Sequence, residues 1–240
     1  MWLLNYILAS YELLIMFSVW GILIGLALFK VATQSKKATT ATRKYFHVLV
    51  VIVFTSGIFI DVDFLYFSSI VSLSIMLLLE HMRFHKIEPL ATILNNAFKI
   101  FKDEKDVGDL VLTNLYLLSG VSLPLWITPD ASKADRILLL SGVLSVGIGD
   151  SMASIIGSKI GKHKLFHSKK TVEGLIASFI SQIMFLKLLQ IANLVHYKNN
   201  IIFIIFSIIL TSFVETITTQ VDNIALPLLL YILISLANLI

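Results

Sequence analysis

About eight long apolar runs occupy most of this chain, and they restrict its fold more than any other feature. A backbone in lipid has to satisfy its own hydrogen bonds, and a helix of about 20 apolar residues is long enough to cross a bilayer. The mean hydropathy of +0.89 is also typical of a membrane protein. We therefore predict an all-α, polytopic integral membrane protein whose transmembrane helices lie at 3–32, 45–60, 64–79, 110–128, 137–156, 172–195, 201–214 and 224–240.

Basic residues are unevenly divided among the connections between these runs. Alternate connections hold 14 Lys and Arg residues, and the remaining ones hold 3. The rich group consists of 33–44, 80–109, 157–171 and 215–223, of which 215–223 itself holds no Lys or Arg, and the poor group consists of 61–63, 129–136 and 196–200. Because Lys and Arg favour the cytosolic side of a membrane, this alternation predicts eight crossings with both termini outside and the rich connections in the cytosol.

The long connection at 80–109 contains a helical pattern of its own. Apolar residues recur at helical spacing from Leu90 to Phe101, directly after Pro89. This pattern predicts a cytosolic amphipathic helix in the membrane interface, and the alternative is a helix that covers the cytosolic ends of the others. Nearby, Glu80 and Arg83 stand three residues apart and could form an ion pair on one helix face.

Composition excludes several classes of function. The chain has no cysteine, so it has neither disulfides nor thiolate chemistry. A nucleic-acid partner is not expected, because the basic residues lie between apolar segments and not on a soluble face.

Gly147 to Gly174 is the stretch whose chemistry points to an anionic ligand. Two glycines, Gly157 and Gly161, allow close approach of the backbone to a ligand, and Asp150 precedes them in an apolar segment. Five lysines follow within twelve residues: Lys159, Lys162, Lys164, Lys169 and Lys170. Such a pattern suits a polyphosphate with a divalent cation, because Mg²⁺ prefers one or two carboxylates together with phosphate oxygens. The simpler alternative is a cytosolic loop that is basic only for topological reasons.

Charged residues near the other predicted cytosolic ends could complete such a site. Arg43, Lys44 and His47 begin the second run. Glu215 and Asp222 lie in a connection without any cation, which indicates a metal or a basic partner from another segment. If this segment stayed helical, their spacing of seven residues would place both on one face. A structural ion pair is the alternative role for Asp150, Glu215 and Asp222.

These motifs together resemble the polyprenol kinase family of CTP-dependent lipid kinases. The similarity runs in order through residues 41–240, whereas residues 1–40 form an N-terminal membrane helix and a basic linker. The stretches that carry it are Arg43-Lys44-Tyr45-Phe46-His47, Glu80-His81-Met82-Arg83, Leu110 to Pro124, Gly149-Asp150-Ser151-Met152-Ala153, Gly157 and Gly161, Lys169-Lys170-Thr171-Val172-Glu173-Gly174, and Glu215 to Asn223 followed by Pro227.

The resemblance implies transfer of the γ-phosphate of CTP to the hydroxyl of dolichol or a related polyprenol. It also implies a location in the endoplasmic reticulum membrane, with the site facing the cytosol and dolichyl phosphate supplied for glycosylation. Mg²⁺ or another divalent cation is then expected on Asp150 and Asp222, with Asp150, Glu215 and Glu173 as catalytic candidates. The CTP-binding candidates are Gly157, Gly161, Lys162, Lys164, Lys169, Lys170, Thr171, Arg43, Lys44 and His47.

Other activities agree with parts of the same pattern. A phytol or farnesol kinase, a CTP-dependent diacylglycerol kinase and a phosphatidate cytidylyltransferase share it in part. A small membrane transporter is the alternative outside enzymes, although the acidic residues gather at one predicted face.

Overall fold

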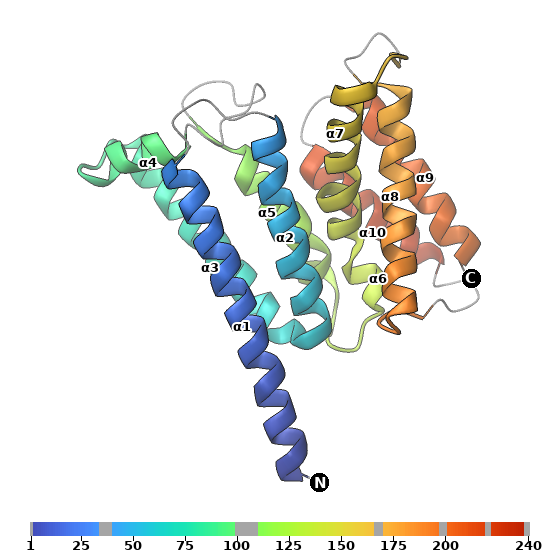
Figure 1. Ribbon diagram of the computed structural model, residues 1–240, viewed down its shortest axis with the longest axis horizontal. Coiled ribbons are helices and arrows are strands. Elements are labelled where there is room, and N and C mark those ends of the chain that lie inside the picture. The colour runs from blue at the N-terminus through green and yellow to red at the C-terminus, as the bar shows by residue number, and fades with distance from the viewer. Residues whose placement is uncertain are drawn as a thin grey trace.

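In the computed structural model the chain is built from helices (Figure 1). The structure describes residues 2–33, 40–98, 110–165, 170–196, 201–218 and 222–237. The elements in these ranges are α1 (Trp2–Thr33), α2 (Thr40–Ile60), α3 (Val62–Phe84), α4 (Leu90–Phe98), α5 (Thr113–Ile127), α6 (Arg136–Leu139), the π-helix η1 (Val143–Asp150), α7 (Ser151–Ile160), α8 (Val172–Ile191), α9 (Ile201–Ile217) and α10 (Asp222–Ala237).

The predicted all-α class is confirmed, and every predicted apolar run contains helix. Among the residues whose side chains the structure describes, three helical stretches are long and apolar enough to cross a membrane: Val62–Phe84, Val143–Ile160 and Val172–Ile191. Four shorter apolar helices cover Tyr11–Ala27, Lys44–Ile60, Ile201–Ile217 and Asn223–Ala237. The count of eight crossings and the domain boundary at residue 40 remain predictions. The helices on the two sides of that boundary, α1 and α2, pack against each other, and the Trp20 indole Nε1 donates to Ser56 Oγ at 2.9 Å.

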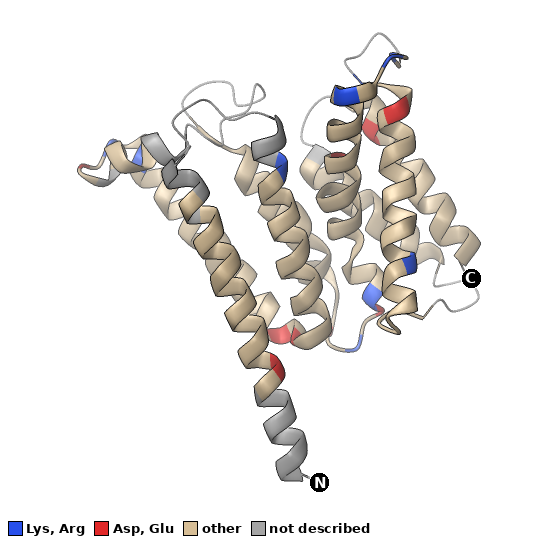
Figure 2. Cartoon of the chain, in the orientation of Figure 1, with Lys and Arg blue, Asp and Glu red and all other residues tan. Residues whose placement is uncertain are grey.

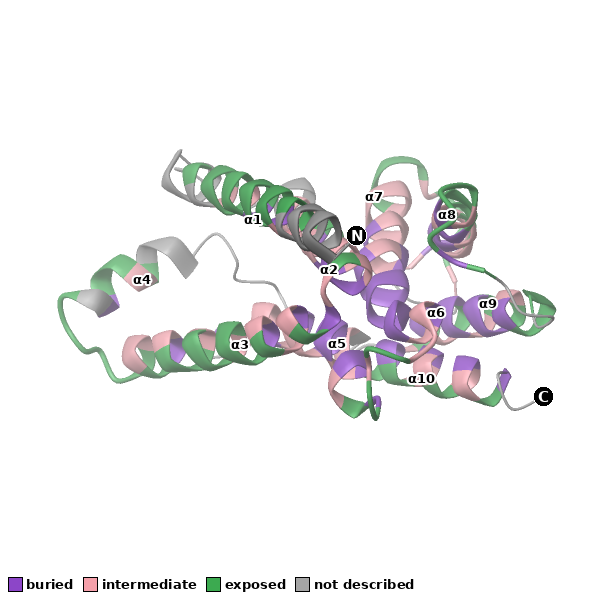
Figure 3. Ribbon diagram, turned by 90° about the horizontal axis from the view of Figure 1, so that it is seen from below, coloured by how far each residue is buried: buried purple, intermediate pink, exposed green. Residues whose placement is uncertain are grey.

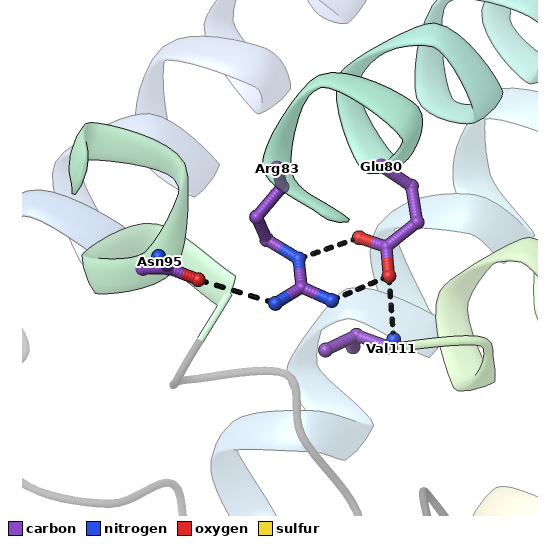
Figure 4. Close-up of polar contacts among 4 residues, drawn as sticks. All are labelled: Glu80, Arg83, Asn95 and Val111. Carbon is purple, nitrogen blue, oxygen red and sulfur yellow. Dashed lines mark hydrogen bonds and ion pairs between the residues drawn. The ribbon is translucent and has the colours of Figure 1, made fainter. Parts of the chain in front are cut away.

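The helix predicted at 64–79 extends to Phe84. It continues past its predicted end because Glu80 and Arg83, which lie there, neutralise each other. The Arg83 guanidinium donates to both carboxylate oxygens of Glu80, at 2.8 and 2.6 Å (Figure 4). Glu80 also accepts a hydrogen bond of 2.7 Å from the Val111 backbone, and Arg83 donates to Asn95 at 3.1 Å. This buried ion pair thereby joins α3 to α4 and to the residues that lead into α5. The predicted pairing of Glu80 and Arg83 is confirmed.

α4 begins at Leu90, as predicted from Pro89 and the apolar spacing. It packs against α3, and Figure 1 shows it projecting sideways from the end of that helix. Its last predicted turn, 99–101, lies outside the described residues.

The run predicted at 137–156 is not one regular α-helix. It consists of the short α6, the π-helix η1, and α7, which continues η1 directly. The glycines of η1 leave room for side chains of the neighbouring helices. A Cβ on Gly147 would lie 2.5 Å from the Val51 side chain on α2. Likewise, a Cβ on Gly149 would lie 2.6 Å from the amide nitrogen of Gln182 on α8. π-Helical segments are uncommon and frequently occur at functional sites.

The core of the molecule surrounds η1, which packs against α2, α5, α8, α9 and α10. Leu140, Val143, Leu144 and Val146 are fully buried there. Figure 3 shows buried residues where α2, α5, α6, α9 and α10 meet, whereas the described residues of α1, α3 and α4 are mainly exposed or intermediate. Many exposed side chains on the outer helices are large and apolar, Phe67 and Phe206 among them. Such a surface is suited to contact with lipid.

Close packing of α5 on α10 depends on Gly120. A Cβ at this position would lie 1.6 Å from the backbone oxygen of Asn223, which no side-chain rotation can relieve. Gly21 on α1 has no such neighbour within 4 Å.

We expect Gly120→Ala to destabilise the protein by at least about 1–3 kcal/mol, the usual cost of overpacking a core. Gly21→Ala is the matched control, and it should be neutral or stabilising by up to about 1 kcal/mol because alanine favours a helix interior. Thermal unfolding of the purified variants in detergent measures both. Equal midpoints for the two variants would contradict this packing.

Candidate functional site

The charged residues of the described chain lie mostly toward the two ends of the helices, with long uncharged stretches between them (Figure 2). At one of these ends, four charged residues from separate segments come together. They are Lys44 of α2, Asp150 of η1, Lys170 beside the start of α8, and Glu215 of α9.

Lys44 and Asp150 form an ion pair between α2 and the last residue of η1. The side chains are 11% and 20% exposed, so the pair lies largely within the protein. His47, one turn after Lys44, places its Nε2 3.7 Å from the same carboxylate oxygen of Asp150. The structure therefore brings together three of the predicted site residues, and the ion pair that was the alternative for Asp150 is present.

Lys170 lies against the C-terminal end of α9. Its ammonium group donates to the backbone carbonyl of Glu215 and, at 3.1 Å, to that of Thr218. The last carbonyls of a helix lack partners within the helix, and a lysine there satisfies them and neutralises the negative end of the helix dipole. The predicted basic partner of the Glu215 segment is thus Lys170, which belongs to the lysine-rich connection 157–171, called the lysine loop from here on.

The idea that Glu215 and Asp222 share one helix face is wrong. α9 ends at Ile217 and α10 begins at Asp222, so no continuous helix connects the two carboxylates. The physical reason is the cap, because Lys170 satisfies the final carbonyls of α9 where the helix stops.

Glu215 is the most deeply buried carboxylate of this group, with 5% of the residue exposed. Its carboxylate accepts a hydrogen bond of 3.2 Å from Ser178 on α8. It also interacts electrostatically with Asp150, Lys170 and Lys44. Two carboxylates and two ammonium groups therefore share one site, where opposite charges compensate one another.

The described residues on the two sides of the lysine loop, 163–165 and 170–172, pair as an antiparallel hairpin at the same end. Lys164 and Thr171 form an antiparallel bridge, and backbone hydrogen bonds of 2.9 Å join Leu165 to Lys170 and Val172 to His163. Glu173 braces this hairpin, because its carboxylate lies 2.7 Å from the His163 ring and accepts from the His163 backbone. Lys162 and Lys164 are exposed to solvent. Their predicted contact with phosphates remains a prediction.

The predicted ligand-binding glycines pack against the start of α8. Thr171 caps that helix by accepting a 3.2 Å hydrogen bond from Gly174. A Cβ on Gly157 would lie 3.0 Å from the Thr171 hydroxyl, and one on Gly161 would lie 2.5 Å from it. Gly161 thus leaves no room for a side chain against Thr171, and Gly157 leaves little. Their backbone approach to a phosphate remains a prediction.

Three predicted residues cannot be placed in the site. Lys169 lies outside the described residues, and the side chains of Arg43 in α2 and Asp222 in α10 are also outside them. Among the described residues no group of three or more His, Asp or Glu side chains is arranged to hold a metal. The assignment of Asp150 and Asp222 as metal ligands therefore remains a prediction.

The sequence analysis missed the polar residues behind Glu215. Gln182 donates to Ser212 at 3.1 Å, and Ser178 lies within 3.3 Å of both. A signal for them exists, because Ser178 and Gln182 are four residues apart in an apolar run, and Ser212 precedes Glu215 by three. Such spacings put each pair on one face of its helix.

Comparison with known proteins decides the family. The family model described as "Dolichol kinase" matches residues 1–211 of the chain. This chain belongs to the dolichol kinase family. It is 37% identical to mouse dolichol kinase and 36% identical to the human protein, over 98% of this chain and 47% of each relative. Dolichol kinase sec59 of Schizosaccharomyces pombe is 33% identical over 85% of this chain and 41% of that protein.

The chain thus spans less than half the length of these relatives. No solved structure matches it. The geometry of the site given above therefore comes from this structure and not from a solved relative.

In this dolichol kinase family member, we expect Lys44→Met and Asp150→Asn each to lower stability by about 3 kcal/mol, because either change leaves a largely buried charge without its partner. The double variant should be more stable than the sum of the two losses predicts, since neither charge remains. Thermal unfolding of the purified variants in detergent measures the coupling. Additive losses would show that the two side chains do not interact.

Proposed function

We propose that this protein transfers the γ-phosphate of CTP to the hydroxyl of dolichol, giving dolichyl phosphate and CDP. The observation that carries the proposal is the convergence of Lys44, Asp150, Lys170 and Glu215 at one end of apolar helices, in a chain of the dolichol kinase family. The proposed location is the endoplasmic reticulum membrane, with this end facing the cytosol and the product used for glycosylation.

The position of the site is suited to a substrate with a lipid tail. A dolichol chain stays in the bilayer, so its hydroxyl can meet a water-soluble nucleotide only at the depth of the lipid headgroups. The charged cluster lies between exposed polar residues of the lysine loop and the apolar core around η1. A nucleotide can therefore approach from the water and an alcohol from the membrane.

The reaction forms a bond between the lipid oxygen and the γ-phosphorus and breaks the bond between that phosphorus and the bridging oxygen of CDP. The hydroxyl proton is released. Phosphoryl transfer needs mostly positioning and neutralisation of charge. We assign phosphate neutralisation to Lys44, Lys169 and Lys170, with further cations from the lysine loop, and acceptance of the hydroxyl proton to Glu215. Glu173 holds the hairpin through His163.

A divalent cation fits the residues present. Asp150 supplies a carboxylate beside that of Glu215 and close to lysines that can bind phosphate, which is the set of groups that Mg²⁺ shares with nucleotides. We propose that Asp150 and Asp222 hold this ion. When bound, it would withdraw negative charge from the phosphate oxygens.

The function is tested with purified protein and CTP labelled at either the α- or the γ-phosphate. We expect label from the γ-phosphate to enter a lipid product when dolichol is added, with release of CDP and loss of transfer when Mg²⁺ is chelated. A panel of phytol, farnesol, diacylglycerol and polyprenols of several lengths should show the highest kcat/KM for dolichol.

The alternatives give different products in the same experiment. Pyrophosphate release and a lipid carrying the α-phosphate label would identify a cytidylyltransferase. Higher kcat/KM with diacylglycerol, phytol or farnesol would identify another lipid kinase. Movement of a solute across vesicles without CTP turnover would identify a transporter.

A further inference from the structure

A buried polar network lies directly behind the Glu215 carboxylate. It consists of Ser178 and Gln182 on α8 and Ser212 on α9, of which none is more than 1% exposed. Polar side chains are costly within apolar helices unless they are hydrogen-bonded to one another, so such a network is expected where it has a task. The packing of α8 on α9 alone requires no polar side chain here.

The network has a direction that follows from the chemistry of its members. While Glu215 is ionised, its carboxylate can only accept hydrogen bonds, and the single proton of Ser178 then points to Glu215 Oε2, 3.2 Å away. Ser178 must then accept from its other neighbours. Gln182 meets this need, because its amide nitrogen lies 3.3 Å from Ser178 Oγ and 3.1 Å from Ser212 Oγ.

The contact between the two serines completes the same direction. Ser212 Oγ lies 3.3 Å from Ser178 Oγ. Because Ser178 has one proton, Ser212 is inferred to donate in this contact whenever the Ser178 proton points to Glu215. The donors therefore run from Gln182 through the serines and end on the carboxylate. Successive hydrogen bonds of this kind polarise one another and favour a single arrangement of the acceptor.

The helix that carries Asp150 leaves room for the network at Gly149. A Cβ at this position would lie 2.6 Å from the Gln182 amide nitrogen and 3.0 Å from Ser178 Oγ. The residue that precedes Asp150 thus rests on the same groups that hold Glu215. Asp150 of η1, Lys44 of α2 and Lys170 beside α8 are the charged groups that interact with this carboxylate.

We propose that Ser178, Ser212 and Gln182 are positioning residues that hold Glu215 through Oε2 and direct its other oxygen, Oε1, toward the reacting groups. This inference rests on the proposed function, in which Glu215 accepts the proton of the lipid hydroxyl. The network itself touches no substrate and acts only through Glu215.

The first test is an infrared measurement that needs no enzymatic activity. Removing the Ser178 hydroxyl should shift a carboxylate band, so the difference spectrum between wild type and Ser178→Ala should contain a displaced carboxylate stretch. The same difference taken in the Glu215→Gln background should lack that band. Ser212→Ala should shift the band in the same direction, as a second variant if Ser178→Ala folds poorly.

Ser207→Ala is the matched control. Ser207 is also a buried serine on α9, but its hydroxyl donates to the carbonyl of Phe203, one turn earlier on the same helix. It should leave the carboxylate bands unchanged. Absence of a shift in both Ser178→Ala and Ser212→Ala, or an equal shift in Ser207→Ala, overturns the network whether or not the protein transfers phosphate.

The second test is a double-mutant cycle of enzyme kinetics, which compares Ser178→Ala in the wild-type protein and in the Glu215→Gln variant. We expect Ser178→Ala to lower kcat by about 10- to 100-fold with KM for CTP changed by less than about twofold, because a misdirected base affects the chemical step. In the Glu215→Gln background, Ser178→Ala should lower kcat by no further factor than about two. If the kcat losses of the two single variants multiply in the double variant, or if Ser178→Ala raises KM with kcat unchanged, the network has a structural role and the positioning claim is overturned.

The two claims fail separately. If wild-type protein transfers no phosphate from CTP to any alcohol, the proposed function fails, and with it the claim that the network serves the reaction. The infrared shift then still decides whether the network orients Glu215. If wild type is active and the cycle is multiplicative, only the positioning claim fails.

Discussion

Ion pairing inside an apolar helical bundle is the constraint on which the rest of this structure depends. A charge within such a bundle is costly unless another charge or a set of hydrogen bonds compensates it. Lys44 compensates Asp150, and Lys170 compensates the carbonyls at the end of α9. Because each contact joins segments that are distant in sequence, the same interactions that make the charges tolerable also fix the relative positions of α2, η1, the lysine loop and α9.

The proposed function requires one charged site to receive two very different substrates. Lys162 and Lys164 of the lysine hairpin are exposed, whereas η1 lies in the apolar core up to Gly149, the residue before Asp150. The π-helical geometry and the glycines of η1 let it pack closely against α2 and α8. In the proposed function, the nucleotide and the lipid alcohol meet at Asp150 and Glu215.

The sequence predicts the helical class, the order of the helices and the end at which the charged residues gather, because apolar runs and lysine-rich connections are local patterns. It predicts the pairing of Glu80 with Arg83 for the same reason, since both lie on one helix face. It cannot predict that Lys44 pairs with Asp150, because the two residues are 106 positions apart and only the packing of α2 on η1 brings them together. The π-helix is missed because apolar periodicity does not reveal a change in helical hydrogen bonding.

The most direct measurement asks where the nucleotide binds, and the absence of cysteine makes it possible. Ser158 is exposed near the end of α7, beside the lysine hairpin, and Ser132 is exposed in the connection between α5 and α6. Each is replaced by cysteine in a separate variant, Ser158→Cys or Ser132→Cys. In sealed vesicles, an impermeant thiol reagent should label the two positions from opposite sides, and CTP with Mg²⁺ should slow labelling at position 158 only. Labelling of both positions from one side, or protection by CTP at position 132 and not at 158, would contradict this account.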